Sequence, residues 1–330
     1  MLYTKFNIAC CFSPELNCFN ESSFPSLDSL CNSRVEKKSS IIREYILSGF
    51  SSYLPEYYYY INTRDGINKV VPMMDCLNKE DRSFESIFEL AKIKGALALK
   101  PDEGSHGDGF YKLSYDENEF HLNGKPASTD EVMAILKNPT NQYLITEYIN
   151  NHSQFKQIYE GAVNTIRMIV FKDRNNDAQI GNAYMRFGSK KTGAVDNMGA
   201  GGMFVQVDID TGKYGNAKII TNNSIKPCPN HPDTGVLMEG YIPHWDMVKK
   251  VVLEVADDIK QLEYFGFDIA VTEDSLKFPE INRFPDYPKI EQLSKKTMSY
   301  LLDKLEDKKR VFGYDKNPCR RLIHLPNREK

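Results

Sequence analysis

The chain has 330 residues, of which 41% are hydrophobic and 26% charged, as is ordinary for a soluble globular protein with two or three subdomains. A formal net charge of −3 argues against non-specific binding to nucleic acid, which requires a basic face. No apolar run reaches the length of about 18 residues that a membrane-spanning helix needs, so we expect no membrane partner.

The N-terminal region, residues 1–85, is predicted to be mainly helical. Apolar residues recur at roughly helical spacing from residue 36 to about residue 61. Within that stretch, the four tyrosines at 57–60 suit either a strand or the end of a helix. A second helix is expected at residues 83–94, where the hydroxyl of Ser83 can cap the first turn.

Short strands dominate the middle of the chain, because apolar runs there are bounded by turn residues. A glycine-rich segment at residues 188–202 is expected to be flexible. It can order over a ligand as a lid, and a plain mobile loop is the alternative. The predicted strands span residues 96–99, 109–113, 119–122, 143–149, 165–172, 178–187 and 204–209, and a short helix spans residues 129–137.

The last part of the chain predicts two helices and a hairpin. The clearest helix covers residues 245–264 and is expected to stop at Gly266, and a final helix covers residues 289–308. Between these helices, strands at residues 266–271 and 278–282 are joined by a polar turn and form the hairpin.

The hairpin collects three hard oxygen donors. Glu280 and Asn282 point the same way because side chains alternate along a strand, and Asp268 faces them from the paired strand. Two carboxylates and an amide carbonyl suit Mg²⁺, which takes oxygen ligands and shares its other positions with substrate phosphates. The alternative is that these residues are solvated turn residues.

A lysine followed by a glycine-rich turn supplies a candidate phosphate site. Lys100 ends a predicted strand and precedes the turn that contains Gly104, Ser105, His106 and Gly107. Backbone N–H groups in such a turn can cradle an anion, and the lysine adds a positive charge. The lysine precedes the glycines and a strand follows them, which excludes a P-loop, a protein-kinase loop and a dinucleotide fingerprint. A hairpin turn rich in glycine is the alternative.

Two arginines lie on predicted strands with their side chains opposite to apolar neighbours. Arg167 alternates with Ile166 and Met168, and Arg186 alternates with Met185 and Phe187. Guanidinium groups suit a γ-phosphate or a substrate carboxylate, and surface salt bridges are the alternative.

Along the chain, the motifs are Lys-Pro with a glycine-rich turn, then a strand ending in Glu147, then Asp268 and the Glu-x-Asn of Glu280 and Asn282. The order of these motifs resembles that of the ATP-grasp superfamily, which includes D-alanine–D-alanine ligases and biotin carboxylases. The likeness covers residues 96–282 and is greatest to the sugar-transfer-associated ATP-grasp family. The motifs that carry it are Val163-Asn164-Thr165-Ile166-Arg167, Arg186-Phe187-Gly188, Val195-Asp196-Asn197 with Gly201-Gly202, Asp210-Thr211-Gly212, His231-Pro232-Asp233-Thr234-Gly235 and Ile242-Pro243-x-Trp245.

The resemblance implies an α+β fold in which two α+β lobes clasp ATP. Residues 86–150 would form the small (lid) subdomain, and residues 151–330 would form the large subdomain with the metal site and a C-terminal helix. Lys100 would contact the α- or β-phosphate. The turn would close over the phosphates through Gly104, Ser105, His106 and Gly107. Contacts with adenine and the rest of the cofactor would come from Glu147, Tyr148, Ile149 and Asn164. Asp268, Glu280 and Asn282 would hold Mg²⁺, or Mn²⁺ in its place.

The activity implied is that of an ATP- and Mg²⁺-dependent carboxylate–amine ligase. It would form an amide or peptide bond through an acyl phosphate, with Arg186, Arg167 and Lys100 as catalytic residues and small-molecule carboxylate and amine substrates. The family name points to sugar- or polysaccharide-linked substrates. A phosphotransferase acting on a hydroxyl and a non-catalytic nucleotide-binding protein are the alternatives, and the oligomeric state stays open.

Two departures from the superfamily pattern stand out. Gly266 lies where many of these ligases have an arginine two residues before the metal aspartate, so Arg186 is the expected substitute. The second nucleotide lysine has no clear match, and Lys69 is a candidate. The seven cysteines are scattered without Cys-x-x-Cys spacing, which favours a reducing compartment, and we expect a cytoplasmic location.

Overall fold

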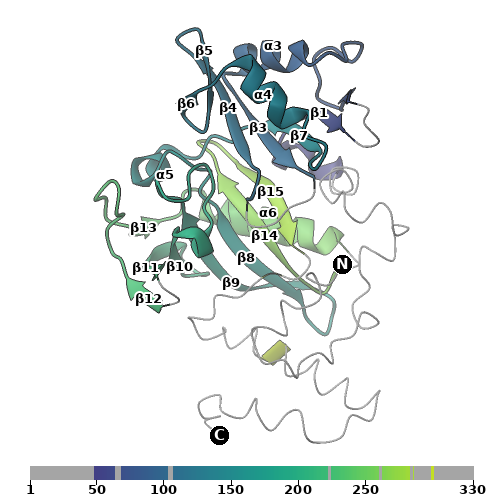
Figure 1. The fold of residues 1–330 in the computed structure, drawn as a ribbon. Helices are drawn as coiled ribbons and strands as arrows, with labels where there is room; N and C mark the ends of the chain where they lie inside the picture. Colours follow the sequence, from purple (N-terminus) through teal and green to yellow (C-terminus); the bar gives the residue numbers. More distant parts are fainter. Residues whose placement is uncertain are drawn as a thin grey trace, which may run out of the picture.

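The computed structural model describes residues 48–63, 68–102, 107–221, 224–259, 262–282, 285 and 299–300. Two antiparallel sheets with helices packed on them form a small lobe and a large lobe (Figure 1), which confirms the predicted α+β class. Across this described part, no helix has the length and apolar character needed to cross a membrane.

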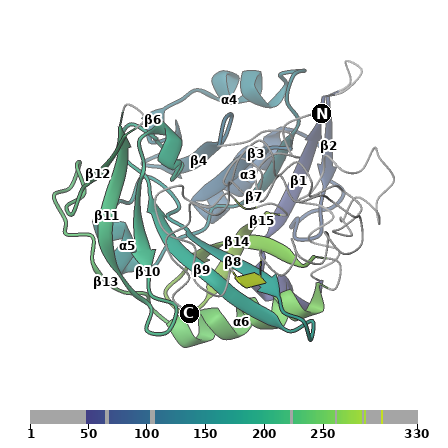
Figure 2. The same ribbon diagram turned by 90° about the horizontal axis from the view of Figure 1, so that it is seen from below.

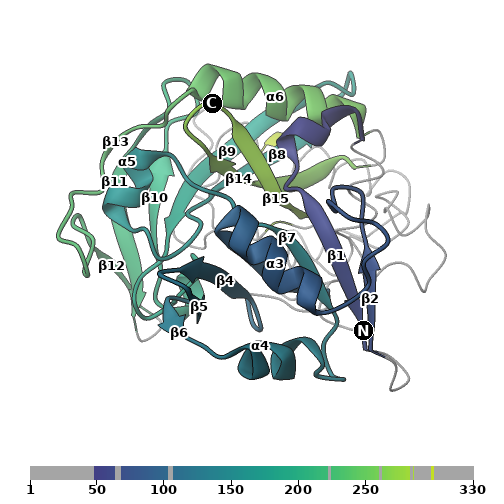
Figure 3. The same cartoon turned by 90° about the horizontal axis from the view of Figure 1, so that it is seen from above.

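The small lobe is built on a seven-stranded sheet with the order β2-β1-β7-β3-β4-β5-β6. Helices α3 and α4 cover one face (Figure 3), where Leu97 and Leu99 of β3 share a core with Ile87 and Val132 of the helices. Alternation along β3 therefore turns Lys100 to the opposite face. The elements are β1 (Tyr57–Asn62), β2 (Lys69–Pro72), α3 (Glu85–Lys94), β3 (Ala96–Pro101), β4 (Tyr111–Asp116), β5 (Glu119–Leu122), β6 (Lys125–Pro126), α4 (Thr129–Leu136) and β7 (Tyr143–Glu147).

The large lobe is built on an eight-stranded sheet with the order β12-β11-β10-β9-β8-β14-β15, and β13 pairs with β11. Helix α6 packs on one face (Figure 2), where Val252 and Val255 share a core with Met168 and Met185. The elements are η4 (Ser48–Tyr53), α5 (Ser153–Ile158), β8 (Ile166–Lys172), β9 (Ala178–Phe187), η6 (Met198–Ala200), β10 (Met203–Val207), β11 (Lys213–Thr221), β12 (Ser224–Pro227), β13 (Gly240–Tyr241), α6 (Trp245–Asp258), β14 (Tyr264–Val271) and β15 (Leu276–Asn282).

The starts of the two small-lobe helices follow from local hydrogen bonding. The Ser83 hydroxyl accepts a hydrogen bond from the Ser86 N–H at 3.3 Å, as its capping role predicts. Helix α4 begins with a capping box, in which Ser128 and Glu131 each accept from the other's backbone N–H.

The predicted hairpin is present and forms one edge of the large sheet. Its turn is closed by a hydrogen bond of 2.9 Å from the Thr272 N–H to the Ser275 carbonyl. Pro279 lies in the edge strand β15, and a register shift between Asp268 and Ala270 interrupts the ladder nearby. A proline within a strand is tolerated at such places, because it has no N–H to donate.

Two predicted helices end earlier than expected. The helical pattern expected to reach about residue 61 gives way to a strand at residues 57–61, which pairs with β2 and β7 and is buried on both faces. Of the two alternatives for the four tyrosines, the strand is therefore confirmed. The helix predicted to reach residue 264 ends at Asp258, where Ile259 leaves the helical conformation with ψ of 83°. Gly266 lies inside β14 instead of ending a helix.

The small sheet includes β1 and β2, so it begins before residue 85, the expected end of the N-terminal region. Apart from residues 299–300, the helix predicted at 289–308 lies outside the described residues, as does the first part of the helical pattern at 36–47. The sequence patterns did not indicate β2, β6, β11, β12, β13 or α5.

The turn between β10 and β11 packs against the first residue of α6 and gives a test of packing. Gly212 has a φ of +71°, and a Cβ at this position would overlap the indole ring of Trp245. Gly124 has a similar φ of +76° with no atom within 4 Å of such a Cβ, so it matches the backbone strain alone. We expect Gly212→Ala to lower the free energy of unfolding by about 2 kcal/mol more than Gly124→Ala in urea titration. Equal losses would contradict the packing.

Candidate active site

The hairpin brings the three predicted metal ligands to one face. In the β14–β15 ladder, Asp268 lies directly opposite Glu280, and Gly266 lies opposite Asn282. Opposed residues of an antiparallel pair project from the same side of the sheet, so all three side chains share one face. The Glu280 carboxylate is exposed, whereas Asp268 is only 4% exposed.

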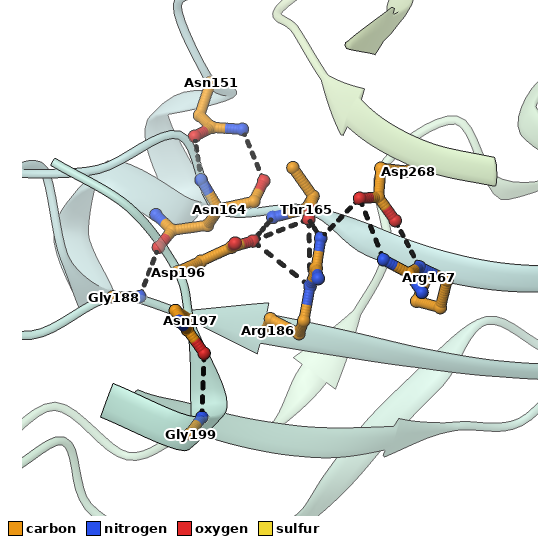
Figure 4. Close-up of polar contacts among 10 residues, drawn as sticks. All are labelled: Asn151, Asn164, Thr165, Arg167, Arg186, Gly188, Asp196, Asn197, Gly199 and Asp268. Carbon is orange, nitrogen blue, oxygen red and sulfur yellow. Dashed lines mark hydrogen bonds and ion pairs between the residues drawn. The ribbon is translucent and has the colours of Figure 1, made fainter. Parts of the chain in front are cut away.

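Both arginines converge on Asp268 (Figure 4). Arg167 lies opposite Asp268 in the β8–β14 ladder, and its guanidinium contacts both carboxylate oxygens, through Nε and, at 3.1 Å, through Nη2. Arg186, on the next strand, places its Nη2 2.9 Å from Oδ2 of the same carboxylate. The surface salt bridges considered as an alternative are therefore not what the structure shows, because this cluster is buried.

The charges in this cluster stabilise one another. Burial disfavours the ionised form of Asp268, but the two guanidinium groups outweigh it and lower the pKa of Asp268 to about 2. Burial also opposes the charge on Arg167, and the neighbouring Asp268 reverses this effect and raises the pKa of Arg167. All three groups are thus charged at neutral pH.

Besides Asp268, a second acidic residue, Asp196, lies beside Arg186. Its Oδ2 accepts hydrogen bonds from Thr165 N at 2.9 Å and Thr165 Oγ1 at 2.6 Å, and lies 3.4 Å from Arg186 Nε. The Thr165 hydroxyl also accepts from Arg186 Nη2 at 2.5 Å. Burial raises the pKa of Asp196, and Arg186 and Thr165 partly offset this effect.

Gly266 is surrounded closely by other side chains. A Cβ built on Gly266 would lie 3.3 Å from Cδ of Arg167 and 2.6 Å from Cβ of Pro285. The guanidinium-bearing side chain next to position 266 is therefore Arg167, from the neighbouring strand. The sequence suggested Arg186 as the substitute for an arginine at this position, and that role stays a prediction.

Lys100 reaches from the small lobe to the β14–β15 hairpin. Its Nζ donates a hydrogen bond of 3.1 Å to the carbonyl of Pro279, the residue directly before Glu280. The lysine that precedes the glycine-rich turn and the acidic pair of the hairpin are therefore neighbours in space, although they are remote in sequence.

The glycine-rich turn is described only from Gly107 onward, and Gly104, Ser105 and His106 lie outside the described residues. Gly107 has a φ of +81°, a conformation that favours glycine. A Cβ at Gly107 would lie 2.7 Å from Cγ1 of Val195, so residue 107 of the small lobe touches the segment 188–202 of the large lobe.

The strand end at residues 147–149 connects the two lobes. The Glu147 carboxylate accepts from Glu56 N at 3.1 Å and forms an ion pair of 3.3 Å with Lys277 of β15. Its side chain therefore fastens β7 to both sheets, and adenine contacts through the backbone of Glu147 and Ile149 stay a prediction.

Lys112, which was not among the predicted site residues, lies beside Tyr148, which was. Lys112 Nζ lies 4.4 Å from the centroid of the Tyr148 ring, a cation–π contact, and burial lowers the pKa of Lys112. The Tyr148 hydroxyl is buried and has no hydrogen-bond partner within the described ranges. Alternation in β4 after the glycine turn was the signal that would have identified Lys112. Lys69, the candidate second lysine, is exposed on β2.

Asn164 braces the scaffold beneath the arginines. Its Nδ2 donates to the Tyr159 carbonyl at 2.7 Å, and its Oδ1 accepts from Gly188 N at 3.0 Å. The side-chain amide of Asn151 donates to the Asn164 carbonyl and accepts from the Asn164 N–H. Asn164 is fully buried and stabilises the scaffold, and its contact with a cofactor stays a prediction.

The donors of the hairpin fit a hard divalent cation. In the described part of the chain, no three His, Cys, Asp or Glu side chains group as metal ligands, and the predicted set is two carboxylates with the Asn282 amide. Asn282 Nδ2 is buried without a hydrogen-bond partner in that part, and a half-turn of the amide would place the oxygen there instead. Glu280 and Asn282 thus suit Mg²⁺, whereas Asp268 would share its oxygens with two arginines.

Comparison with known proteins adds a family. A model described as sugar-transfer associated ATP-grasp matches residues 35–298. Among solved structures, the chain is similar to D-alanine–D-alanine ligase from Bacillus anthracis, with 15% identity, 82% of this chain and 67% of that chain covered, and a TM-score of 0.41. It is also similar to N5-carboxyaminoimidazole ribonucleotide synthetase from Thermotoga maritima, with 9% identity, 79% and 44% covered, and a TM-score of 0.40. No curated protein gives a significant match.

The buried cluster predicts an asymmetry between two carboxylates that lie opposite each other. Asp268→Asn leaves two buried guanidinium groups without their shared counter-charge, and we expect the free energy of unfolding to fall by about 3 kcal/mol or more. Glu280→Gln alters an exposed carboxylate and should change it by less than about 0.5 kcal/mol. Urea titration of both variants checks this. Similar losses for the two would show that Asp268 does not carry the charge balance.

Proposed function

The chain belongs to the sugar-transfer-associated ATP-grasp family, and from this premise we propose that it is an ATP- and Mg²⁺-dependent carboxylate–amine ligase. ATP would phosphorylate a carboxylate, an amine would attack the acyl phosphate, and an amide or peptide bond would form as phosphate leaves. The family description supports sugar- or polysaccharide-linked substrates within this proposal.

One observation carries the proposal. The hydrogen bond of 3.1 Å between Lys100 Nζ and the Pro279 carbonyl puts a cation of one lobe beside the acidic hairpin of the other. A triphosphate and its divalent ion need this combination, because positive side chains hold the phosphate oxygens while oxygen donors hold the metal. Lys100, Glu280 and the two arginines meet this requirement.

Each residue has a task in the proposed reaction. Lys100 would hold phosphate oxygens, and the Gly107 turn would cover them. Arg167 and Arg186, kept charged by Asp268, would stabilise negative charge that builds up on the transferred phosphoryl group. No proton transfer is needed from these groups, since their role is to position and to neutralise.

The metal would be held mainly by Glu280 and Asn282, with Asp268 at its side. When bound, Mg²⁺, or Mn²⁺ in its place, neutralises phosphate charge and lowers the barrier to phosphoryl transfer. Lys100 bonds to the carbonyl directly before Glu280, so a metal at Glu280 would lie near phosphates held by Lys100.

The adenine would lie at the strand end where Tyr148, Ile149 and Lys112 meet. The Tyr148 hydroxyl, buried without a partner in the described part, offers a hydrogen-bonding group at this place. We further propose a cytoplasmic location, where ATP is available. It is consistent with Cys76 and Cys228, the described cysteines, both of which are free thiols.

Product analysis tests the reaction. Purified protein is incubated with MgATP and a panel of carboxylates paired with amino acids or amino sugars, and ADP, phosphate and amide products are measured. The proposal expects ADP and phosphate release that requires both substrates. A stable phosphorylated hydroxyl product would replace the ligase with a phosphotransferase, and an absence of Mg²⁺-dependent ATP binding would refute both.

Glu280→Ala separates the site from the scaffold. We expect it to reduce ATP turnover by at least about a hundredfold, because it removes the exposed metal donor, while stability changes little. Glu254→Ala, which removes an exposed carboxylate of α6, is the matched control and should retain full turnover. Phosphate release measures both variants. Unaltered turnover in Glu280→Ala would contradict the assigned metal site.

A further inference from the structure

The segment 188–202 is fastened at both ends, in contrast to the flexible loop expected from its glycines. At its start, Gly188 N donates to Asn164 Oδ1, and the Gly188 carbonyl lies 2.9 Å from His231 Nε2. His231 Nδ1 accepts from Asp233 N, which leaves the proton on Nε2, and the ring stacks on Tyr159. These contacts involve the His231-Pro232-Asp233-Thr234-Gly235 motif.

The end of the segment folds back on itself. Gly202 N donates to the Asn197 carbonyl at 2.9 Å, and Ser189 Oγ donates to the Gly201 carbonyl at 3.2 Å. A Cβ at Gly202 would lie 2.8 Å from the Asn197 carbonyl oxygen, so a larger residue does not fit. The path of the segment at Val195 and Asp196 is thereby set by its two ends.

Two consecutive residues of this path touch different lobes. Asp196 contacts Arg186 and Thr165 of the large sheet, as Figure 4 shows. Val195 lies against Gly107, the first described residue of the glycine-rich turn in the small lobe. The segment therefore connects the turn expected to cover the phosphates with an arginine expected to face them.

Asp196 matters because the other acid that holds Arg186 has a competing task. Arg186 contacts Asp268, Asp196 and the Thr165 hydroxyl, and Asp268 also pairs with Arg167. A divalent cation beside Asp268 would draw on the same carboxylate oxygens. The contacts described for Asp196 are to Thr165 and Arg186, and they involve neither Arg167 nor the hairpin. Its ion pair with Arg186 would therefore persist when a cation binds at Asp268.

We propose that Asp196 is a positioning residue, which holds Arg186 toward the γ-phosphate, and that the Val195–Gly107 contact makes this position depend on the glycine-rich turn. This inference rests on the proposed function. It predicts that Asp196 affects only ligands with a third phosphate, and only when Arg186 is present.

Binding of two nucleotides separates this role from a general structural one. The affinities of Mg²⁺ with ADP and with a non-hydrolysable imido analogue of ATP are measured by calorimetry, which needs no knowledge of the substrates. The quantity compared is the ratio of the affinity for the ATP analogue to the affinity for ADP. We expect Arg186→Ala to lower this ratio by about tenfold or more, and Asp196→Asn to lower it as well. In the Arg186→Ala background, Asp196→Asn should have no further effect.

Asp233→Asn is the matched control, because Asp233 accepts a 2.7 Å hydrogen bond from Lys190 N in the same segment without touching Arg186. It should leave the ratio of affinities unchanged. A second variant, Thr165→Val, removes the hydroxyl shared by Asp196 and Arg186 and covers the case in which Asp196→Asn does not fold; it should lower the ratio to a smaller extent.

Three outcomes would overturn the positioning role: no change of the ratio in Asp196→Asn, an equal change in Asp233→Asn, or a change that persists without Arg186. These outcomes leave the proposed function intact as long as wild-type protein binds Mg²⁺ with the ATP analogue. If wild-type protein binds neither nucleotide, the proposed function itself fails.

The Val195–Gly107 contact has its own double-mutant test. Gly107→Ala introduces both a positive-φ strain and the overlap with Val195, and only the overlap is relieved by Val195→Ala. We expect Gly107→Ala to reduce affinity for the ATP analogue less in the Val195→Ala background than in wild-type protein. An equal reduction in both backgrounds would remove the turn from the proposal.

Discussion

The buried ionic cluster of Asp268 with Arg167 and Arg186 is the interaction on which the site depends. Two guanidinium groups and one carboxylate lie within the large sheet, where each would be costly alone. Their register is the reason that they are tolerated, because Arg167 stands directly opposite Asp268 and Arg186 reaches it from the next strand. A shift of one residue in β14 would turn Asp268 into the apolar core and leave both arginines without a partner.

The two lobes contact each other at two described places. Lys100 of the small lobe bonds to the carbonyl that precedes Glu280 of the large lobe. Gly107 of the small lobe lies against Val195 of the large lobe. In the proposed function, neither lobe alone has all the charged groups that a metal-bound triphosphate needs. Nucleotide recognition would then depend on the relative position of the two sheets, between which Glu147 and Lys277 form an ion pair.

Sequence patterns were most informative where they are local. Alternation predicted that Arg167 and Arg186 avoid the apolar face, and two short apolar runs around a polar turn predicted the hairpin that holds Asp268. The contact between Arg167 and Asp268 joins residues 101 positions apart, so it depends on a strand order that the sequence does not display. The four tyrosines at 57–60 carry no alternation because both of their faces are buried, and the pattern of α6 continues past Asp258 because β14 is equally apolar. Asp196 was placed on a flexible loop, since its partners become visible only in three dimensions.

Strand β15 is the outermost strand of its sheet in the part of the chain that the structure describes, and this location has a consequence for association with other molecules. Outer strands leave backbone groups unpaired and are natural points of aggregation, which proteins counter with prolines, charged side chains or a covering element. Here Pro279 removes one donor, Glu280 adds a negative charge, and Lys100 caps the Pro279 carbonyl. Among the described residues, the groups proposed for nucleotide recognition thus also disfavour intermolecular β-pairing along this strand, and we expect substitutions in the site to favour self-association.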